Sequence, residues 1–226
     1  MSQDALSLGK TPSPIEADIR YLFAERDFQA AERRIEDALE QEGDDPDVRA
    51  LAGEVFFRIR NYGRALDEFE TARKSGPLAV DYADMAMRAA YSEGNLDRAA
   101  DFAQEILSED ASHESALMRL GRIHNQRKDW AAALETWTRL SAVDPGREDA
   151  LVQVMRGHYR GKDWPNVLKW ARRVLEVTPD NTDALSAGAT AAFRLIDYAA
   201  LEPLGVKLAQ TGGEAALKLS RQVHDR

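Results

Sequence analysis

The chain contains no cysteine, and only four of its 226 residues are histidine. Without cysteine there is no disulfide bond and no thiolate for nucleophilic or metal chemistry. Hydrophobic residues make up 44% of the chain, yet no run approaches the roughly 20 apolar residues of a membrane-spanning helix. Residues 1–14 are polar, so we expect no signal peptide and a soluble, cytoplasmic protein. The abundance of Ala and Arg is typical of bacterial chains.

The chain has fewer basic than acidic residues. The 30 Lys and Arg residues face 39 Asp and Glu residues, which gives a formal net charge of −9 at pH 7. Nucleic-acid binding depends on clustered Lys and Arg side chains that neutralise phosphates. The charge balance therefore argues against a nucleic-acid partner.

A small or apolar residue recurs every 34 residues, at Ala31, Ala65, Ala99, Ala133, Val167 and Leu201. The residue three places before each copy keeps the same spacing, at Phe28, Tyr62, Leu96, Trp130, Trp164 and Tyr198. A single globular core has no reason to repeat at this interval. The period indicates a stack of helical hairpins, each of which buries its apolar face only against its neighbours.

Each 34-residue unit is expected to contain two helices. With the recurring residue as position 20, the units span 12–45, 46–79, 80–113, 114–147, 148–181 and 182–215. Apolar or small residues at positions 4, 7, 8 and 11, and again at 17, 20, 24 and 27, have the spacing of one helix face. A polar break such as Arg60-Asn61 or Lys162-Asp163 separates the two sets. This pattern predicts two helices of roughly 14 residues joined by a tight turn.

Several boundaries have the residues expected of helix ends. Ser13 is a candidate N-cap, followed by Pro14 at the first helical position and by Glu16. In the sixth unit, by contrast, Pro203 falls inside the second helix and is expected to kink or restart it near Leu201.

Small residues at positions 8 and 20 predict close helix crossings. Gly53 with Ala65, and Gly121 with Ala133, are such pairs. A small residue lets two backbones approach, and a larger neighbour fills the space beside it.

These residues carry a family resemblance. One unit contains Gly53-x-x-Phe56, Tyr62-x-x-Ala65 and Pro77, and another contains Leu117-x-x-Leu120-Gly121 with Trp130, Ala133 and Pro145. Over residues 12–215 the chain resembles the tetratricopeptide repeat family. The resemblance implies an all-α, right-handed α-solenoid of six helix-turn-helix repeats. We expect residues 1–11 to be a disordered tail, and residues 216–226 to be a capping helix with an apolar stripe of Ala216, Leu219 and Val223.

No catalytic, metal or cofactor site is predicted. His124 and His158 share position 11 of consecutive units, but packed helices lie about 8–10 Å apart. No Cys or ordered Asp and Glu set completes a zinc site around them. Ring packing, at a position where another unit has Phe56, is the favoured interpretation. Gly-rich phosphate loops and nucleophile motifs are absent from the sequence, so we expect no enzyme activity.

The family resemblance implies a concave groove lined by a second stripe of the first helix in each unit. Its candidate binding residues are Arg20, Phe57, Arg58, Arg88, Tyr91, Arg122, Asn125, Arg156, Tyr159, Arg160 and Phe193. Guanidinium forks and aromatic faces suit peptides that carry carboxylates or an amphipathic face. The alternative is that the aromatics pack between repeats and the arginines are balanced by an aspartate row of Asp47, Asp81, Asp149 and Asp183.

Two kinds of function remain open. The first is a scaffold or adaptor that binds a peptide or partner protein, which an acidic ligand would suit, or that self-associates through the ends of the array. The second is an interaction module of, or a partner to, a bacterial enzyme such as a glycosyltransferase or sulfotransferase. The family's clamp for terminal carboxylates uses Lys and Asn, but the corresponding residues here are Glu16 and Arg20, so the chain does not reproduce it.

Overall fold

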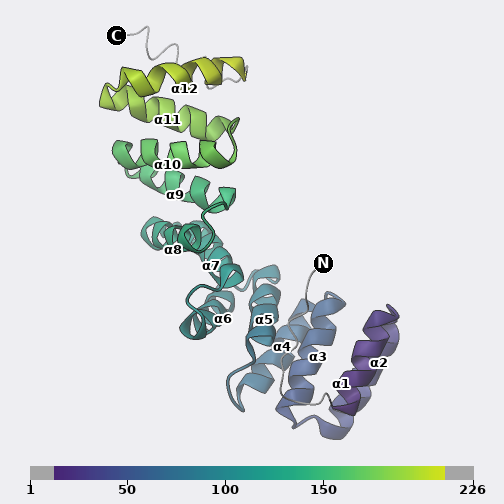
Figure 1. Cartoon of the computed structure of the whole chain (residues 1–226). Coiled ribbons are helices and arrows are strands. Elements are labelled where there is room, and N and C mark those ends of the chain that lie inside the picture. Colours follow the sequence, from purple (N-terminus) through teal and green to yellow (C-terminus); the bar gives the residue numbers. More distant parts are fainter. Residues whose placement is uncertain (1–12, 212–226) are drawn as a thin grey trace. The chain divides into compact units, whose positions relative to one another are not determined.

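The computed structural model describes residues 13–211, and within this range the chain forms twelve α-helices and no strand (Figure 1). The predicted tail at 1–11 and the predicted capping helix at 216–226 lie outside the described residues. Within residues 13–211, no helix has the length and hydrophobicity needed to cross a bilayer. The all-α prediction is confirmed.

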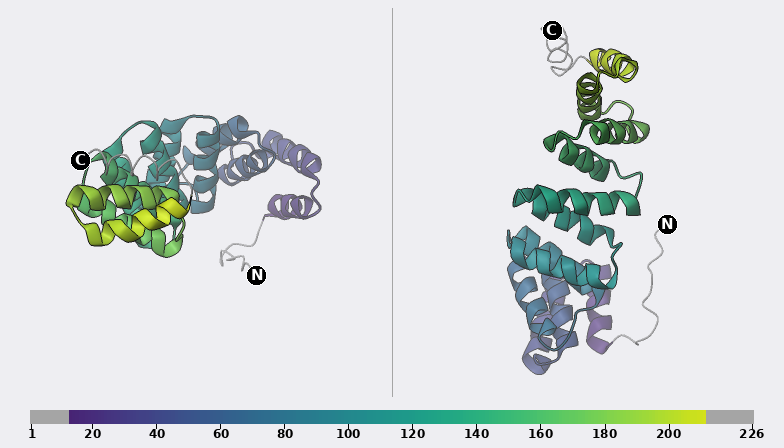
Figure 2. Two further views of the ribbon diagram at one scale, coloured as in Figure 1. Left: turned by 90° about the horizontal axis from the view of Figure 1, so that it is seen from above. Right: turned by 90° about the vertical axis from the view of Figure 1, so that its left-hand side faces the viewer.

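The chain divides into two compact units, one ending at Glu109 and the other beginning at Asp110. We call these two parts of the chain the first unit and the second unit, and we call the 34-residue segments repeats. The first unit contains α1 (Pro14–Ala24), α2 (Phe28–Glu42), α3 (Pro46–Arg58), α4 (Tyr62–Arg73), α5 (Val80–Ser92) and α6 (Leu96–Glu109). The second contains α7 (Glu114–Gln126), α8 (Trp130–Val143), α9 (Glu148–Arg160), α10 (Trp164–Val177), α11 (Thr182–Leu195) and α12 (Tyr198–Gln210). In the right-hand view of Figure 2, the helices of the second unit follow one another as successive layers.

The helices keep the phase of the sequence repeat. The six recurring residues Phe28, Tyr62, Leu96, Trp130, Trp164 and Tyr198 are the first residues of the six even-numbered helices. Ser13 caps α1 as predicted, since its Oγ accepts a hydrogen bond from the Glu16 backbone N–H at 3.3 Å. The starts of the even-numbered helices therefore recur every 34 residues, in step with the sequence repeat.

One turn geometry joins the two helices of every pair between residues 13 and 211. The residue two places before each even-numbered helix has a left-handed backbone, with φ between 55° and 76°, at Arg26, Arg60, Gly94, Lys128, Lys162 and Ile196. The next residue is Asp or Asn, and its backbone N–H donates to the carbonyl five residues earlier, as Asp163 does to His158 at 3.0 Å. Its side chain then caps the following helix. This combination satisfies both helix ends with local bonds alone.

Aromatic rings fill the space above the predicted small residues. A Cβ built on Gly53 would lie 2.6 Å from the Phe69 ring, and one built on Gly121 would lie 2.7 Å from the Trp137 ring. Phe69 is fully buried and Trp137 almost so. Glycine at these two positions therefore allows a large ring to pack directly against helix backbone.

Of the two predicted effects of Pro203, a restart of the last helix near Leu201 is wrong, and a kink stays a prediction. α12 runs from Tyr198 to Gln210 as one helix that contains Pro203. Pro203 lacks the N–H that would donate to the carbonyl four residues earlier, so the helix forgoes one hydrogen bond there. Asp197 caps the helix through Ala200, and Ala200 and Leu208 are buried, which stabilises α12 on both sides of the proline.

Candidate partner-binding surface

In the first unit, the arginines of the predicted surface are paired with acids one helical turn earlier. Arg20 lies 2.5 Å from Glu16, Arg58 2.7 Å from Glu54, and Arg88 bonds Asp84 at 3.5 Å. Spacings of four residues bring such side chains together on a helix surface. The arginines of these pairs are exposed although their acid partners are half-buried, so the pairs contribute modestly to stability, but they neutralise the arginines locally.

Aromatic rings and arginines alternate along one edge of the same unit. The ring centroids of Phe57 and Tyr62 lie 5.7 Å apart, and the guanidinium of Arg88 lies 4.9 Å from the Phe57 centroid. Arg58 lies in the same way over Phe23, at 4.7 Å. Each arginine thus contacts a ring of the preceding hairpin, which is the geometry of a cation–π interaction.

Three further residues of the predicted set are Tyr91, Arg122 and Asn125. Tyr91 is half-buried at the end of α5. Arg122 is exposed on α7 and has no carboxylate partner within residues 13–211. Asn125 donates from Nδ2 to Oε1 of Gln153 at 3.1 Å and so links α7 to α9.

In the second unit the remaining predicted residues gather near the ends of α9 and α11. Arg156 on α9 bonds Asp183 on α11, which agrees with the aspartate-row alternative at this one position. Tyr159 and Trp164 meet edge to face, with centroids 5.5 Å apart and planes at 83°. Arg160 lies 4.1 Å from the ring centroid of Trp130. Phe193, half-buried on α11, is the last member of the predicted set.

A pocket of about 590 Å³ opens beside this group, and we call it the cationic–aromatic pocket. Its lining residues are Tyr159, Arg160, Lys162, Trp164 and Arg194. The predicted set of binding residues contains Tyr159 and Arg160 but not Lys162, Trp164 or Arg194, although Arg194 is the position-13 arginine of the sixth repeat. Arg194 has the same place in its repeat as Arg160, and Lys162 is the left-handed residue of its turn, so the repeat register held a signal for both.

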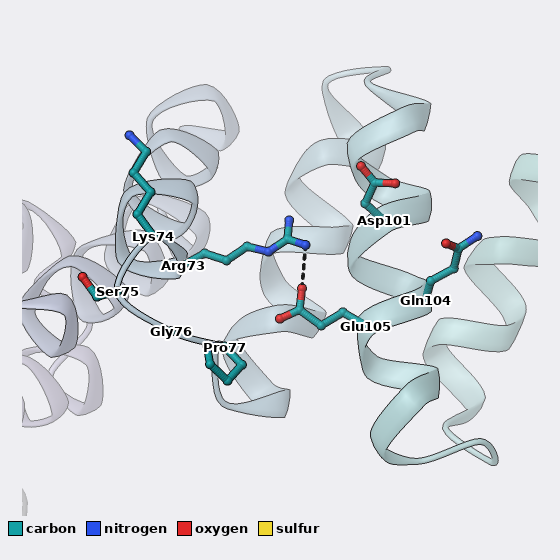
Figure 3. A pocket seen from close by; sticks show the side chains of 8 residues that line it. All are labelled: Arg73, Lys74, Ser75, Gly76, Pro77, Asp101, Gln104 and Glu105. Carbon is teal, nitrogen blue, oxygen red and sulfur yellow. Dashed lines mark ion pairs between the residues drawn. The ribbon is translucent and has the colours of Figure 1, made fainter.

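A second pocket, of about 730 Å³, lies in the first unit between the α4–α5 connection and α6 (Figure 3). Arg73 extends from the end of α4 toward Glu105 on α6, and their Nη2 and Oε2 atoms are 2.9 Å apart. The N–H of Arg73 does not point at this oxygen, so the contact is an ion pair without hydrogen-bond geometry. Arg73 also lies 4.8 Å from the Phe102 centroid. The charges of this central cation and acid therefore offset each other across the pocket.

The histidines at position 11 of their repeats, His124 and His158, lie in the last turn of their helices, and the His158 side chain takes part in the turn that follows. His158 Nδ1 lies 3.1 Å from Oδ2 of Asp163, the cap of α10. Hydrogen bonds from Asn166, assisted by His158, hold the pKa of the Asp163 carboxyl below its usual value. Burial lowers the pKa of His124. Within the described part of the chain, no group of three or more His, Asp or Glu side chains is arranged to hold a metal ion.

Paired helices in a fixed 34-residue register, with an edge of arginines and aromatics, define a helical repeat protein. The sequence pattern of the tetratricopeptide repeat matches residues 18–80, 51–114 and 90–155. These matches together cover more than half of the chain. The chain belongs to the tetratricopeptide repeat family.

Solved structures with the same fold support this assignment. YrrB, described as a TPR protein with an unusual peptide-binding site, is 20% identical with a TM-score of 0.66, over 78% of this chain and 91% of YrrB. MamA is 14% identical with a TM-score of 0.64, over 71% of this chain and 94% of MamA. PilF of Pseudomonas aeruginosa is 15% identical with a TM-score of 0.60, over 92% of this chain and 97% of that structure. No curated protein matches this chain in sequence. At these identities the likeness is one of fold.

Proposed function

We propose that this chain is a non-catalytic protein-interaction scaffold that binds a peptide or a partner protein over the exposed surface of the odd-numbered helices within each compact unit. The observation that carries the proposal is the alternation of arginines and aromatic rings along the helix ends, as in Arg160 over Trp130 and Arg58 over Phe23. The proposal includes no cofactor and no metal.

The chemistry of this edge suits protein recognition. Trp, Tyr and Arg are the residues that most often dominate binding energy at protein interfaces. A guanidinium already held over a ring loses less side-chain entropy on binding than a freely rotating one. Tyr159 and Trp130 are each 41% exposed, so a partner would remove substantial apolar area from water.

An acidic or amphipathic segment is the ligand chemistry that we infer. Guanidinium groups bind carboxylates through charge-assisted, bidentate hydrogen bonds. Arg122 and Arg156 lie on consecutive odd-numbered helices of the second unit, α7 and α9. The pairing of Arg156 with Asp183 means that a ligand carboxylate would have to displace an existing partner there, whereas Arg122 needs no such exchange within the described residues.

The test is partner capture with the triple variant Arg88→Ala, Arg122→Ala and Arg156→Ala. We expect the wild-type chain to retain a defined set of proteins from a bacterial lysate, identified by mass spectrometry. The triple variant should retain them less well, and raised salt should weaken retention in the same way. Arg172→Ala, which removes an exposed arginine of α10, is the matched control.

A different pattern would contradict the proposal. If the triple variant melts at a lower temperature while retaining the same partners as the wild type, the arginines are structural. The single variant Arg122→Ala guards against a folding artefact, because no ion pair with a described carboxylate is lost there.

A further inference from the structure

The cationic–aromatic pocket lies where three helices of the second unit meet. Tyr159 and Arg160 end α9, Lys162 occupies the turn, Trp164 begins α10, and Arg194 lies at the end of α11. Its volume of about 590 Å³ falls within the range of ligand sites on proteins. All five side chains come from three successive helices and one turn of this unit.

Aromatic rings hold the walls of the pocket in place. Trp164 meets Tyr159 edge to face at 5.5 Å, and the guanidinium of Arg194 lies 5.9 Å from the Trp164 centroid. Arg160 is closer to its ring, at 4.1 Å from the Trp130 centroid. A guanidinium stacked on a ring keeps the N–H groups in its own plane available for a ligand. Ring contacts thus support four of the five lining residues, and Lys162 is the exception.

The three cations of the pocket have no carboxylate partner within residues 13–211. In the first unit, Arg58 has the same place in its repeat as Arg160, but there both Nε and Nη2 bond Glu54. One turn before Arg160 stands Arg156, and one turn before Arg194 stands Thr190. Neither Arg156 nor Thr190 has a carboxylate that could pair with the arginine as Glu54 does. The positive charges of Arg160 and Arg194 are therefore not neutralised in the way seen for Arg58.

The carboxylates nearest along the chain have other partners. Asp163 follows Lys162, and its two oxygens accept from the backbone and side chain of Asn166 and contact His158. Asp197 caps α12 by accepting from Ala200 at 3.1 Å. Both acids are fixed at helix N-termini, where the helix dipole also favours their negative charge.

We propose that the cationic–aromatic pocket binds an acidic peptide segment in which a glutamate or aspartate lies beside an aromatic residue. The carboxylate accepts hydrogen bonds from the guanidinium groups of Arg160 and Arg194, with Lys162 adding charge at the rim. The neighbouring aromatic residue packs on the exposed faces of Tyr159 and Trp164. The inference rests on the proposed function, because it gives the ligand chemistry for one part of the same surface.

The experiment uses the full chain and an end-blocked peptide, Gly-Glu-Phe-Glu-Phe-Glu-Gly, with its glutamine-substituted twin as the neutral control. The indole N–H resonances of the four tryptophans report the place of binding, with buried Trp137 as the internal reference. We expect the acidic peptide to shift the resonance of Trp164 and to leave that of Trp137 in place. The glutamine peptide should bind much more weakly.

Variants test each cation. Arg160→Gln, Lys162→Gln and Arg194→Gln should each weaken binding of the acidic peptide, by about tenfold for the two arginines. Arg172→Gln on α10 removes the same charge outside the pocket and should leave the affinity unchanged. Lys162 is an exposed turn residue, so Lys162→Gln stays informative even if Arg160→Gln perturbs the packing on Trp130.

Three outcomes would overturn the inference. Equal affinity for the two peptides would remove the carboxylate from recognition. Unchanged affinity in the three pocket variants would place binding elsewhere. A single-stranded polyuridine oligonucleotide that binds tightly through Arg160 and displaces the peptide would make the pocket a nucleic-acid site. If the acidic peptide fails while partner capture still depends on Arg122, this inference fails and the proposed function stands.

Discussion

Arg58 in the first unit and Arg160 in the second hold the same place in the repeat, and each lies over an aromatic ring of the preceding hairpin. The ring is Phe23 near the end of α1 for Arg58 and Trp130 at the start of α8 for Arg160. Their distances to the ring centroids, 4.7 Å and 4.1 Å, are similar. They differ in the residue one turn earlier, which is Glu54 in the first unit and Arg156 in the second. Both arginines thus lie over a ring of the preceding hairpin, whereas the carboxylate pairing of each one depends on the residue one turn earlier.

Substitution of the two packed glycines is expected to have the largest effect. Gly53→Val in the first unit and Gly121→Val in the second force a branched side chain into an aromatic ring, which should lower the free energy of unfolding by about 1–3 kcal/mol. All four tryptophans lie in the second unit, so their fluorescence follows that unit alone, while circular dichroism follows both. We expect Gly121→Val to lower the urea midpoint seen by fluorescence, and Gly53→Val to lower mainly that seen by circular dichroism.

Two half-buried helical glycines with open space beside their Cα atoms serve as controls for this experiment. The nearest atom to a Cβ on Gly63 is 4.0 Å away, and a Cβ on Gly205 has no neighbour within 4 Å. Gly63→Ala and Gly205→Ala should therefore stabilise their units by about 0.5–1 kcal/mol. If the valine variants behave like these alanine variants, close ring packing on the glycine backbone is not what selects glycine there.

An acid placed before Arg160 should make the second unit resemble the first. Arg156→Glu puts a carboxylate one turn before Arg160, as Glu54 stands before Arg58, and should weaken binding of the acidic peptide by about tenfold. Arg156→Gln separates the new carboxylate from the loss of the Arg156 charge and its bond to Asp183. Affinity is measured by titration of the labelled peptide followed by fluorescence anisotropy. Equal losses in the two variants would mean that pairing does not control this cation.

The left-handed turn residues give a smaller contrast between the units. Gly94 in the first unit has φ of 76°, and Ile196 in the second has φ of 59° although it is β-branched and 70% exposed. A left-handed backbone costs a non-glycine residue about 1–2 kcal/mol, and Asn tolerates it better than Ile. Gly94→Ala should therefore destabilise the chain and Ile196→Asn should stabilise it, each by about 1 kcal/mol or less in urea unfolding. A destabilising Ile196→Asn would show that the exposed isoleucine makes a contact that offsets its strain.

The smallest expected effect is a pH dependence at position 11 of the repeat, which is Phe56 in the first unit and His124 in the second. Burial lowers the pKa of His124; Arg127 adds to the effect, while Asp129 and Glu135 oppose it. The unfolded state then binds a proton more readily than the folded state, so stability falls as the pH drops below about 6.5. The tryptophan-detected urea midpoint should fall from pH 7.5 to pH 5. His124→Gln should reduce that fall, and an identical fall in this variant would assign the effect to other groups.

Much of the fold could be predicted because the repeat imposes local rules. The period fixed the start of every even-numbered helix, and Ser13 marked the start of α1. The continuity of α12 through Pro203 could not be predicted from proline propensity. Capping by Asp197 and burial of Leu208 lie outside any propensity scale, and they outweigh one missing hydrogen bond.

Less of the candidate site than of the fold could be predicted from the sequence. The register brought Tyr159 and Arg160 into one surface, but ring contacts between helices, such as Arg194 with Trp164, join residues 30 positions apart. Ion pairing added a second difficulty, since Arg156 bonds an aspartate of the next repeat whereas Arg58 bonds a glutamate of its own helix. The row of arginines in the sequence is compatible with pairing inside one helix and with pairing between repeats, so the sequence does not distinguish the two.

The recurring turn determines which substitutions the proposed binding surface can accept during evolution. Its backbone is held by an Asp or Asn side chain and by backbone bonds to the preceding helix. The left-handed residue contributes its φ angle and one backbone N–H donor, which almost every residue type can supply. Arginine, glycine, lysine and isoleucine all occupy that position in this one chain. A residue beside the binding surface can therefore be exchanged at a cost of about 1 kcal/mol and without a change of fold. Lys162 occupies such a position at the rim of the cationic–aromatic pocket. Substitution there can therefore change the charge of the proposed binding site while the helical hairpin keeps its fold.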